Sequence, residues 1–286
     1  MVFATRLLSA VVGVPLMLAL LYWGAMWQGG WPFFVVVAAA VIIGMREFYV
    51  GASGKDLQPI PLIGYAAALV YLFAVWFARE EFRPGLMTAA VVIAVAGSLA
   101  VRVLSAEIKG ATASVGVTVA GFLYVACLFS FMLRLRQLDL HEILGRVPEG
   151  GFRAEVGVLF LVIAATWLLD TGAYGFGKSF GSVKMAPTLS PNKTLEGAIG
   201  GLATAVVVAT LVSVWLRLDA LDGVVMGLLI GVAGQLGDLS ESVFKRDMGL
   251  KDFGSMIPGH GGVLDRFDSL LFAMPVVYWC FSILVP

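Results

Sequence analysis

The sequence has too little charge to cover a soluble protein of its length. Only 13% of its 286 residues are Asp, Glu, Lys or Arg, whereas 60% are hydrophobic, and the mean hydropathy is +0.95. Soluble domains carry about 25% charged residues. The composition therefore excludes an ordinary soluble protein and indicates that lipid surrounds most of the surface. The formal net charge of zero also argues against a nucleic-acid partner.

Cysteine is almost absent as well. Cys127 and Cys280 lie deep in separate apolar runs, and the sequence contains no C-x-x-C spacing. Two such thiols provide neither a disulfide framework nor a zinc site. We interpret both as small apolar core residues.

Long apolar stretches fill the chain instead. A helix needs about 20 apolar residues to cross a bilayer core of roughly 30 Å, and we count nine such stretches. The first, after Arg6, is longer than the apolar core of a signal peptide, so we expect it to be retained. The sequence predicts an all-α transmembrane bundle of about nine helices, with about five N-terminal spans in 1–155 and a catalytic region of about four in 156–286. The expected spans are 6–27, 31–50, 60–78, 85–104, 112–133, 156–176, 195–216, 223–243 and 264–285.

The basic residues divide unequally between the two membrane faces. With nine spans the termini lie on opposite faces, and twelve of the nineteen Lys and Arg residues fall on the face of the N-terminus. Loops rich in Lys and Arg stay in the cytoplasm. We therefore expect a multi-pass protein of the cytoplasmic (inner) cell membrane, with its N-terminus and active site in the cytoplasm.

Glycine recurs every four residues in the eighth span. Gly223, Gly227 and Gly231 form one stripe, and glycine lets helix backbones approach closely in lipid. We interpret this stripe, together with Gly197 and Gly201 in the seventh span, as helix packing rather than as a binding site.

A first polar motif begins at the end of the sixth span, in ATWLLDTGAYGFGKSFG. Ionisable residues at membrane depth are costly and usually functional. The next segment, GSVKMAPTLSPNKTLEG, predicts a flexible loop of glycines and lysines whose backbone N–H groups can face phosphates. Thr194 suits either an N-cap of the seventh span or a direct substrate contact, and both roles stay open.

A second motif, GQLGDLSESVFKRDMGLKDFGSMIPGHGGVLDRFD, joins the eighth span to the ninth. Asp238 and Glu241 lie three residues apart, as do Asp265 and Asp268, so each pair shares a face of a continuing helix. Mg²⁺ usually takes one or two carboxylates together with substrate phosphates. The second motif therefore predicts a hard-cation site, surrounded by cations that suit a polyphosphate: Lys245, Arg246, Lys251 and Arg266.

The same residues carry a resemblance to a known family. Ser242-x-Phe244-Lys245-Arg246, Lys251-Asp252 and Pro258-x-His260-Gly261-Gly262-x-x-Asp265-Arg266-x-Asp268 are similar to the signature of the phosphatidate cytidylyltransferase (CDP-diacylglycerol synthase) family. The similarity extends over residues 165–270, whereas the preceding residues resemble the family only as generic membrane spans.

The resemblance implies an enzyme of phospholipid biosynthesis in the lipid bilayer that converts CTP and phosphatidic acid to CDP-diacylglycerol and pyrophosphate. It implies Mg²⁺ as cofactor, with a second cation left open, and we expect a homo-oligomer, in the first instance a dimer. A phosphate-binding or loop-organising role suits His260 at least as well as that of a base. The expected catalytic residues are Lys245, Arg246, Lys251, Asp252, His260 and Arg266; the substrate-binding residues are Asp170, Tyr174, Lys178, Ser190, Lys193, Thr194, Glu196 and Ser242; and the metal ligands are Asp238, Glu241, Asp265 and Asp268.

Other classes of protein stay open at this point. A transporter or channel fits glycine-rich spans and intramembrane carboxylates, but the polar residues gather on one face and no inverted repeat is visible. A cytidylyltransferase for archaeal-type ether lipids, or a polyprenol kinase, keeps the superfamily and changes the lipid. A CDP-alcohol phosphotransferase is disfavoured because its D-G-x-x-A-R core is absent.

Overall fold

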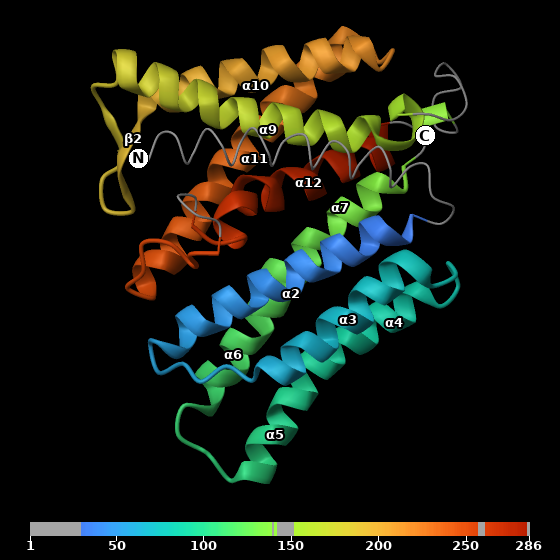
Figure 1. The fold of residues 1–286 in the computed structure, drawn as a ribbon, viewed down its shortest axis with the longest axis vertical. Helices are drawn as coiled ribbons and strands as arrows, with labels where there is room; N and C mark the ends of the chain where they lie inside the picture. The colour runs from blue at the N-terminus through green and yellow to red at the C-terminus, as the bar shows by residue number, and fades with distance from the viewer. Residues whose placement is uncertain (1–29, 139, 142–151, 257–260, 285–286) are drawn as a thin grey trace. The chain divides into compact units, whose positions relative to one another are not determined.

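The computed structural model describes residues 30–138, 140–141, 152–256 and 261–284. Most of these residues are helical (Figure 1), which confirms the all-α prediction. The predicted first span, 6–27, lies outside the described residues. The elements are α2 (Trp31–Ser53), α3 (Pro61–Phe77), α4 (Arg83–Val92), the π-helical turn η1 (Ile93–Gly97), α5 (Ser98–Ser105), α6 (Ala111–Gly121), the π-helical turn η2 (Phe122–Cys127), α7 (Leu128–Arg136), α9 (Phe152–Phe180), β1 (Lys184–Ala186), β2 (Ser190–Thr194), α10 (Leu195–Trp215), α11 (Ala220–Asp247) and α12 (Leu264–Leu284).

Within the part of the chain that the structure describes, six helical stretches are long and apolar enough to cross a membrane, as judged by length and composition. Every predicted span that falls within the described residues coincides with helix, so this is a multi-pass membrane protein. The total of about nine spans stays a prediction. The six stretches are Trp31–Ser53, Arg83–Ser105, Ala111–Arg136, Val156–Phe180, Leu195–Trp215 and Ala220–Asp247, and α3 is a shorter apolar helix of 17 residues.

The chain groups into two compact units. Unit 1 is Met1–Arg134 with Asp247–Arg266, and unit 2 is Leu135–Arg246 with Phe267–Pro286. The second motif is therefore divided: the connection between α11 and α12 belongs with the N-terminal helices, whereas the end of α11 belongs with α9 and α10. The assignment of catalysis to 156–286 stays a prediction.

In unit 1, Tyr49 fixes the C-terminal part of α2. The Tyr49 hydroxyl donates a hydrogen bond to the carbonyl oxygen of Thr118 over 2.8 Å, and its side chain is buried. A Cβ atom at Gly64 or Gly121 would overlap with the Tyr49 ring or hydroxyl. Glycine at these two positions leaves room for the ring, so α3 and α6 hold this part of α2 between them.

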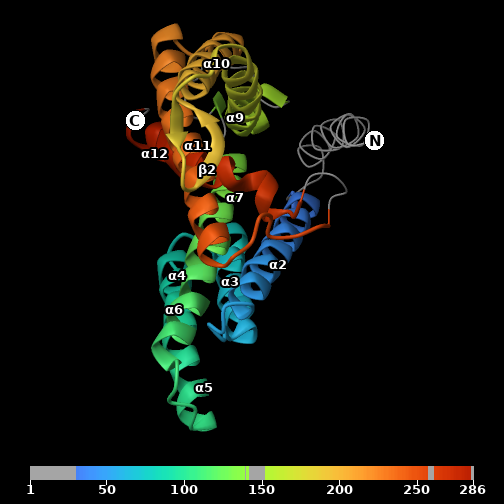
Figure 2. The same ribbon diagram turned by 90° about the vertical axis from the view of Figure 1, so that its left-hand side faces the viewer.

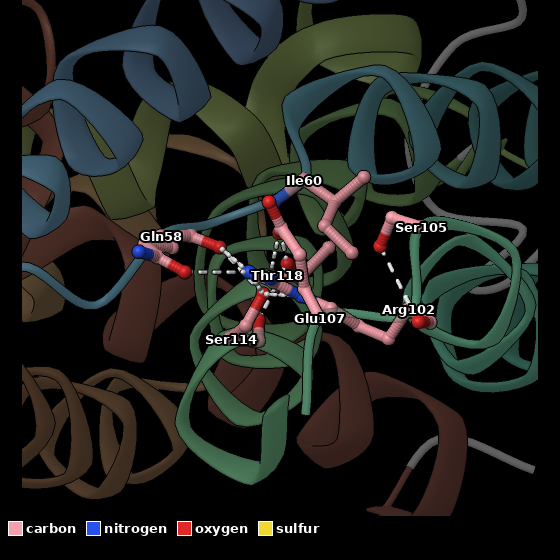
Figure 3. Close-up of polar contacts among 7 residues, drawn as sticks. All are labelled: Gln58, Ile60, Arg102, Ser105, Glu107, Ser114 and Thr118. Atoms are coloured by element: carbon pink, nitrogen blue, oxygen red, sulfur yellow. Dashed lines mark hydrogen bonds and ion pairs between the residues drawn. The ribbon is translucent and has the colours of Figure 1, made fainter. Parts of the chain in front are cut away.

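A buried arginine ties the connection between α2 and α3 to α5 and α6 (Figure 3). Arg102 donates hydrogen bonds to the carbonyl oxygen of Gln58 over 3.0 Å and to the Ser114 hydroxyl over 2.6 Å. Its guanidinium also pairs with Glu107 at 2.6 Å. A buried charge is tolerated where its donors find acceptors, so this network holds the chain immediately after α2 in one place.

Glycines bring the helices of unit 2 into close contact. A Cβ atom at Gly223 would lie 2.6 Å from the Cα atom of Thr210 in α10, and one at Gly227 would lie 2.5 Å from the Cα atom of Val206. Backbone atoms cannot move aside cheaply, so these positions exclude any side chain. The interpretation of the stripe as helix packing is confirmed, and the same holds for Gly231, Gly197 and Gly201.

The segment between α9 and α10 is a hairpin, so the prediction of a flexible loop was wrong. α9 continues past its expected end at residue 176 to Phe180, and β1 then pairs antiparallel with β2. Figures 1 and 2 show the hairpin at the joint end of α9 and α10. Neighbouring chain lies close to two glycines of α9. A Cβ atom at Gly172 would overlap with the Thr204 hydroxyl of α10, and one at Gly177 would lie 3.1 Å from the hydroxyl oxygen of Thr194, at the end of β2.

Candidate functional site

A cavity of about 550 Å³ lies within unit 2. The C-terminal part of α9 forms one wall, β2 and the start of α10 form another, and α11 contributes a third. Small-molecule sites have volumes of about 300–1,000 Å³. Seven of the predicted site residues line this cavity: Asp170, Tyr174, Lys178, Ser190, Lys193, Thr194 and Asp238. Asn192 and Gln235 also line it and were not identified from the sequence.

Beside the cavity, α10 begins directly after Thr194 and packs closely against α9. The Thr194 hydroxyl oxygen accepts a hydrogen bond from the amide of Gly197 over 3.2 Å, which confirms its role as the N-cap of α10. A Cβ atom at Gly197 would lie 2.8 Å from the carbonyl oxygen of Ala173, so the two backbones meet here. Because Thr194 also lines the cavity, its contact with substrate stays a prediction.

Charges of both signs line the cavity. Lys193 and Asp238 form an ion pair, and their side chains are 28% and 29% exposed. The Lys178 ammonium lies 5.8 Å from the centre of the Tyr174 ring, and Asp170 is exposed. A partly exposed lysine can exchange a carboxylate partner for a phosphate, because both accept charge-assisted hydrogen bonds. The cavity thus offers cations to a phosphate and carboxylates to a metal ion.

The last turns of α11 contain a buried ion pair. Glu241 is fully buried, and its Oε2 accepts a hydrogen bond from the Lys245 ammonium at 2.5 Å. In α12, the backbone of Asp268 lies against α11, because a Cβ atom at Gly237 would come 2.5 Å from the Asp268 carbonyl oxygen. Three of the four predicted metal ligands, Asp238, Glu241 and Asp268, therefore belong to unit 2, near the contact between α11 and α12. Ser242, which follows Glu241 in the sequence, is also buried.

Two further predicted residues hold the hairpin. The Arg246 Nε donates a hydrogen bond to the carbonyl oxygen of Leu189 over 3.1 Å. The Glu196 carboxylate accepts hydrogen bonds from the Ser182 hydroxyl and, over 3.2 Å, from the Val183 amide. Arg246 and Glu196 do not line the cavity. Their hydrogen bonds instead help to hold the hairpin, whose strand β2 does line it.

In unit 1, Asp265 organises the signature loop, a name we use for the described residues 248–256 and 261–263 between α11 and α12. Asp265 is buried, and its Oδ2 accepts hydrogen bonds from the amides of Phe253 over 2.9 Å and Gly262 over 2.8 Å. One carboxylate thereby holds two points of the loop that are nine residues apart in the sequence. Of the other predicted residues here, Lys251, Asp252 and Arg266 are exposed, and His260 lies outside the described residues.

Sequence reasoning missed Glu47 of α2. Its carboxylate accepts hydrogen bonds from the amides of Val263 over 3.0 Å and Leu264 over 2.9 Å. The available signal was an acidic residue inside an apolar span, which is costly without a partner. Glu47 lies in the region that resembles the family only as generic membrane spans.

Lys245→Ala and Arg246→Ala are expected to differ in stability. Removing Lys245 takes the ammonium away from the fully buried Glu241 carboxylate, which should cost about 3–5 kcal/mol. Arg246 is exposed, so its replacement should leave stability nearly unchanged and lower turnover by releasing the hairpin. Thermal unfolding in detergent and turnover per folded molecule measure the two effects. Equal stabilities of the two variants would contradict the importance of the buried pair.

The cavity lies beside apolar helices and is lined by lysines and carboxylates. These features are those of a membrane-embedded protein that acts on phosphate-bearing substrates. The apolar surfaces of these helices indicate that lipid surrounds them. The paired charges suit both a phosphate and its counter-ion.

Comparison with known proteins identifies the family within this class. Residues 4–284 match the model of the cytidylyltransferase family. The chain is 34% identical over 297 residues to a phosphatidate cytidylyltransferase of Synechocystis, covering 98% of this chain and 97% of that protein. It is 37% identical over 171 residues to the Bacillus subtilis protein of the same name, covering 59% of each, and 42% identical over 156 residues to that of Staphylococcus aureus strain COL, covering 54% of each. The chain belongs to the cytidylyltransferase family and is a cytidylyltransferase enzyme, as the resemblance of the two motifs predicted.

Proposed function

We propose that this enzyme transfers a cytidylyl group from CTP to phosphatidic acid and releases pyrophosphate. The observation that carries the proposal is the cavity in unit 2, where Lys178 and Lys193 occur with Asp170 and Asp238 at the ends of apolar helices. A site at such a place can receive a nucleotide from water and a lipid phosphate from the bilayer. The names of the relatives supply the identities of the two substrates.

The chemistry requires neutralisation of charge more than a strong base. An oxygen of the phosphatidic acid phosphate attacks the α-phosphorus of CTP, and the bond from that phosphorus to the bridging oxygen breaks as pyrophosphate leaves. The attacking oxygen is already negatively charged, so little general-base help is required. Repulsion between the two anions is the main obstacle, and lysine lowers it by pairing with phosphate oxygens. Lys178 and Lys193 are the proposed phosphate-binding residues of the cavity.

Mg²⁺ is the proposed cofactor, and its candidate ligands stay Asp238, Glu241, Asp265 and Asp268. Among the described residues, no group of three His, Cys, Asp or Glu side chains forms a ready-made metal site. Mg²⁺ commonly takes only one or two carboxylates and completes its shell with water and substrate phosphates. Asp238, a partly exposed carboxylate in the cavity, fits this donor set. The bound ion would stabilise negative charge on the leaving pyrophosphate.

The activity is tested with the purified full-length protein, CTP, Mg²⁺ and phosphatidic acid in mixed micelles. We expect CDP-diacylglycerol and pyrophosphate in equal amounts. Diacylglycerol is the control acceptor, because it has the same chains and lacks the attacking phosphate. A polyprenol acceptor tests the kinase alternative. Phosphorylation of the polyprenol without any CDP-lipid from phosphatidic acid would contradict the proposed function.

The hairpin and the signature loop are proposed to face the cytoplasm, where CTP is found. Ser182 and Ser255 are exposed positions in these two segments. Single cysteines at these positions, with Cys127 and Cys280 replaced by Ser, are expected to react with an impermeant thiol reagent only from the cytoplasmic side. The basic asymmetry of the loops is the physical reason. Labelling of either cysteine from outside would overturn this topology.

A further inference from the structure

Glu47 is an ionisable side chain placed where an apolar one would be expected. It lies in α2, and only 6% of its surface is exposed. Burying a carboxylate costs several kcal/mol unless hydrogen bonds or an opposite charge compensate. Its partners therefore indicate what the carboxylate does.

Both carboxylate oxygens bind the start of α12. Oε1 accepts a hydrogen bond from the amide of Val263, and Oε2 accepts one from the amide of Leu264. Amides at a helix start have no acceptor within their own helix, and the positive end of the helix dipole favours a negative charge there. Glu47 thus acts as an N-cap of α12 supplied by another helix.

The signature loop is shaped around the same carboxylate. A Cβ atom at Gly262 would lie 2.5 Å from either Glu47 oxygen, and one at Gly254 would overlap with Oε1. Both glycines therefore leave space that the carboxylate occupies. The space that Glu47 occupies explains why positions 254 and 262 of the second motif are glycine, although Glu47 lies about 210 residues away in the sequence.

The element that carries Glu47 is held firmly. Two residues further along α2, Tyr49 is fixed between α3 and α6 by its hydrogen bond to Thr118. Phe48 packs against Phe253 of the signature loop, with ring centres 5.9 Å apart. The carboxylate therefore occupies a defined place, and the loop that binds it takes its position from α2.

We propose that Glu47 is a positioning residue, which holds the signature loop and the first turn of α12 in the geometry that the transfer reaction needs. The inference rests on the proposed function. Glu47 acts through Asp265, which stands next to Leu264 and itself binds Phe253 and Gly262. A displacement of about 1 Å in a reactive geometry can cost on the order of 10²-fold in rate.

Glu47→Gln is the first test. Gln keeps the size of the side chain but presents its NH₂ group to one of the two backbone amides. At that amide two hydrogen-bond donors then face each other, and the hydrogen bond is lost. We expect kcat to fall about 10- to 100-fold with little change in the KM for CTP, because the loss lies in the transition state. Hydrogen exchange of a peptide covering residues 261–266 is expected to become faster. Glu81→Gln is the matched control, because Glu81 is an exposed glutamate in the same unit.

A double-mutant cycle tests the contact itself. Gly262→Ala alone should impair turnover, because its methyl group would overlap with the Glu47 carboxylate. Combined with Glu47→Ala, it should add much less than its single effect, because the overlapping group is gone. Additive losses would contradict direct coupling between these two residues.

The exchange measurement needs no turnover and so separates this inference from the proposed function. If the wild-type protein transfers no cytidylyl group, the proposed function fails while the exchange data still decide whether Glu47 anchors the loop. If hydrogen exchange becomes faster in Glu47→Gln while kcat stays at the wild-type value, Glu47 anchors the loop but does not position it for the reaction. That result would overturn the inference. Wild-type exchange in folded Glu47→Gln would overturn it as well.

Discussion

Replacing Asp238 by Asn is expected to lower turnover on the order of 10²-fold while the protein keeps its fold. The Asp238 carboxylate lines the cavity and pairs with Lys193. Asn keeps the shape of the side chain and removes its charge, which weakens both a Mg²⁺ ligand and the partner of the lysine. Since both side chains are partly exposed, the loss of the pair should cost little stability, about 0–1 kcal/mol.

Asp222→Asn is the matched control for this experiment. It makes the same change in the same helix, at an exposed position in the first turn of α11, and turnover is expected to be unchanged. The rate of each variant is measured against Mg²⁺ concentration. A folded Asp238→Asn protein that reaches the wild-type rate at the wild-type Mg²⁺ concentration would exclude this carboxylate from the reaction.

Lys193→Met separates the two roles of Asp238. If the carboxylate acts only by holding Lys193, the double variant should lose no more than Lys193→Met alone, because Asp238 then has nothing left to hold. If it binds Mg²⁺, the Mg²⁺ requirement should rise in the variants that lack Asp238 and stay unchanged in Lys193→Met. We expect the second pattern.

The positions of the helices were predictable because the bilayer requires about 20 apolar residues for each span. Their ends were not. α9 was expected to end at residue 176 and α11 at residue 243, but they end at Phe180 and Asp247. Hydropathy reports where apolar side chains stop, whereas backbone hydrogen bonds continue through the polar residues that follow. The first motif therefore lies largely on a helix and not in a loop.

Residue type indicated which polar residues to examine, but not what they contact. The cavity residues of the first motif were found because ionisable side chains at the ends of apolar helices are costly. Arg246 binds the turn of a hairpin that the sequence did not predict, so its contact could not be foreseen. Glu47 lies 216 residues from Val263, and no local spacing connects two positions so far apart.

Asp265→Asn and Asp265→Ala are expected to separate two roles of a single carboxylate. Asp265 Oδ2 accepts the amides of Phe253 and Gly262. The Asn carbonyl oxygen has the same size and can accept both hydrogen bonds without the negative charge. Ala provides no acceptor, so each of the two buried amides would lose its partner at a cost of about 1–3 kcal/mol.

The proposed Mg²⁺ ligand role predicts that both variants lose turnover, on the order of 10²-fold. In Asp265→Asn the loss should come with a higher Mg²⁺ requirement and with wild-type hydrogen exchange in peptides that contain Phe253 and Gly262. In Asp265→Ala the same peptides should exchange faster. Asp56→Asn, an exposed position in the same unit, is the control for the loss of a negative charge. If Asp265→Asn works at the wild-type rate with the wild-type Mg²⁺ dependence while Asp265→Ala does not, the carboxylate holds the signature loop and binds no metal, because only its shape as a hydrogen-bond acceptor is then required.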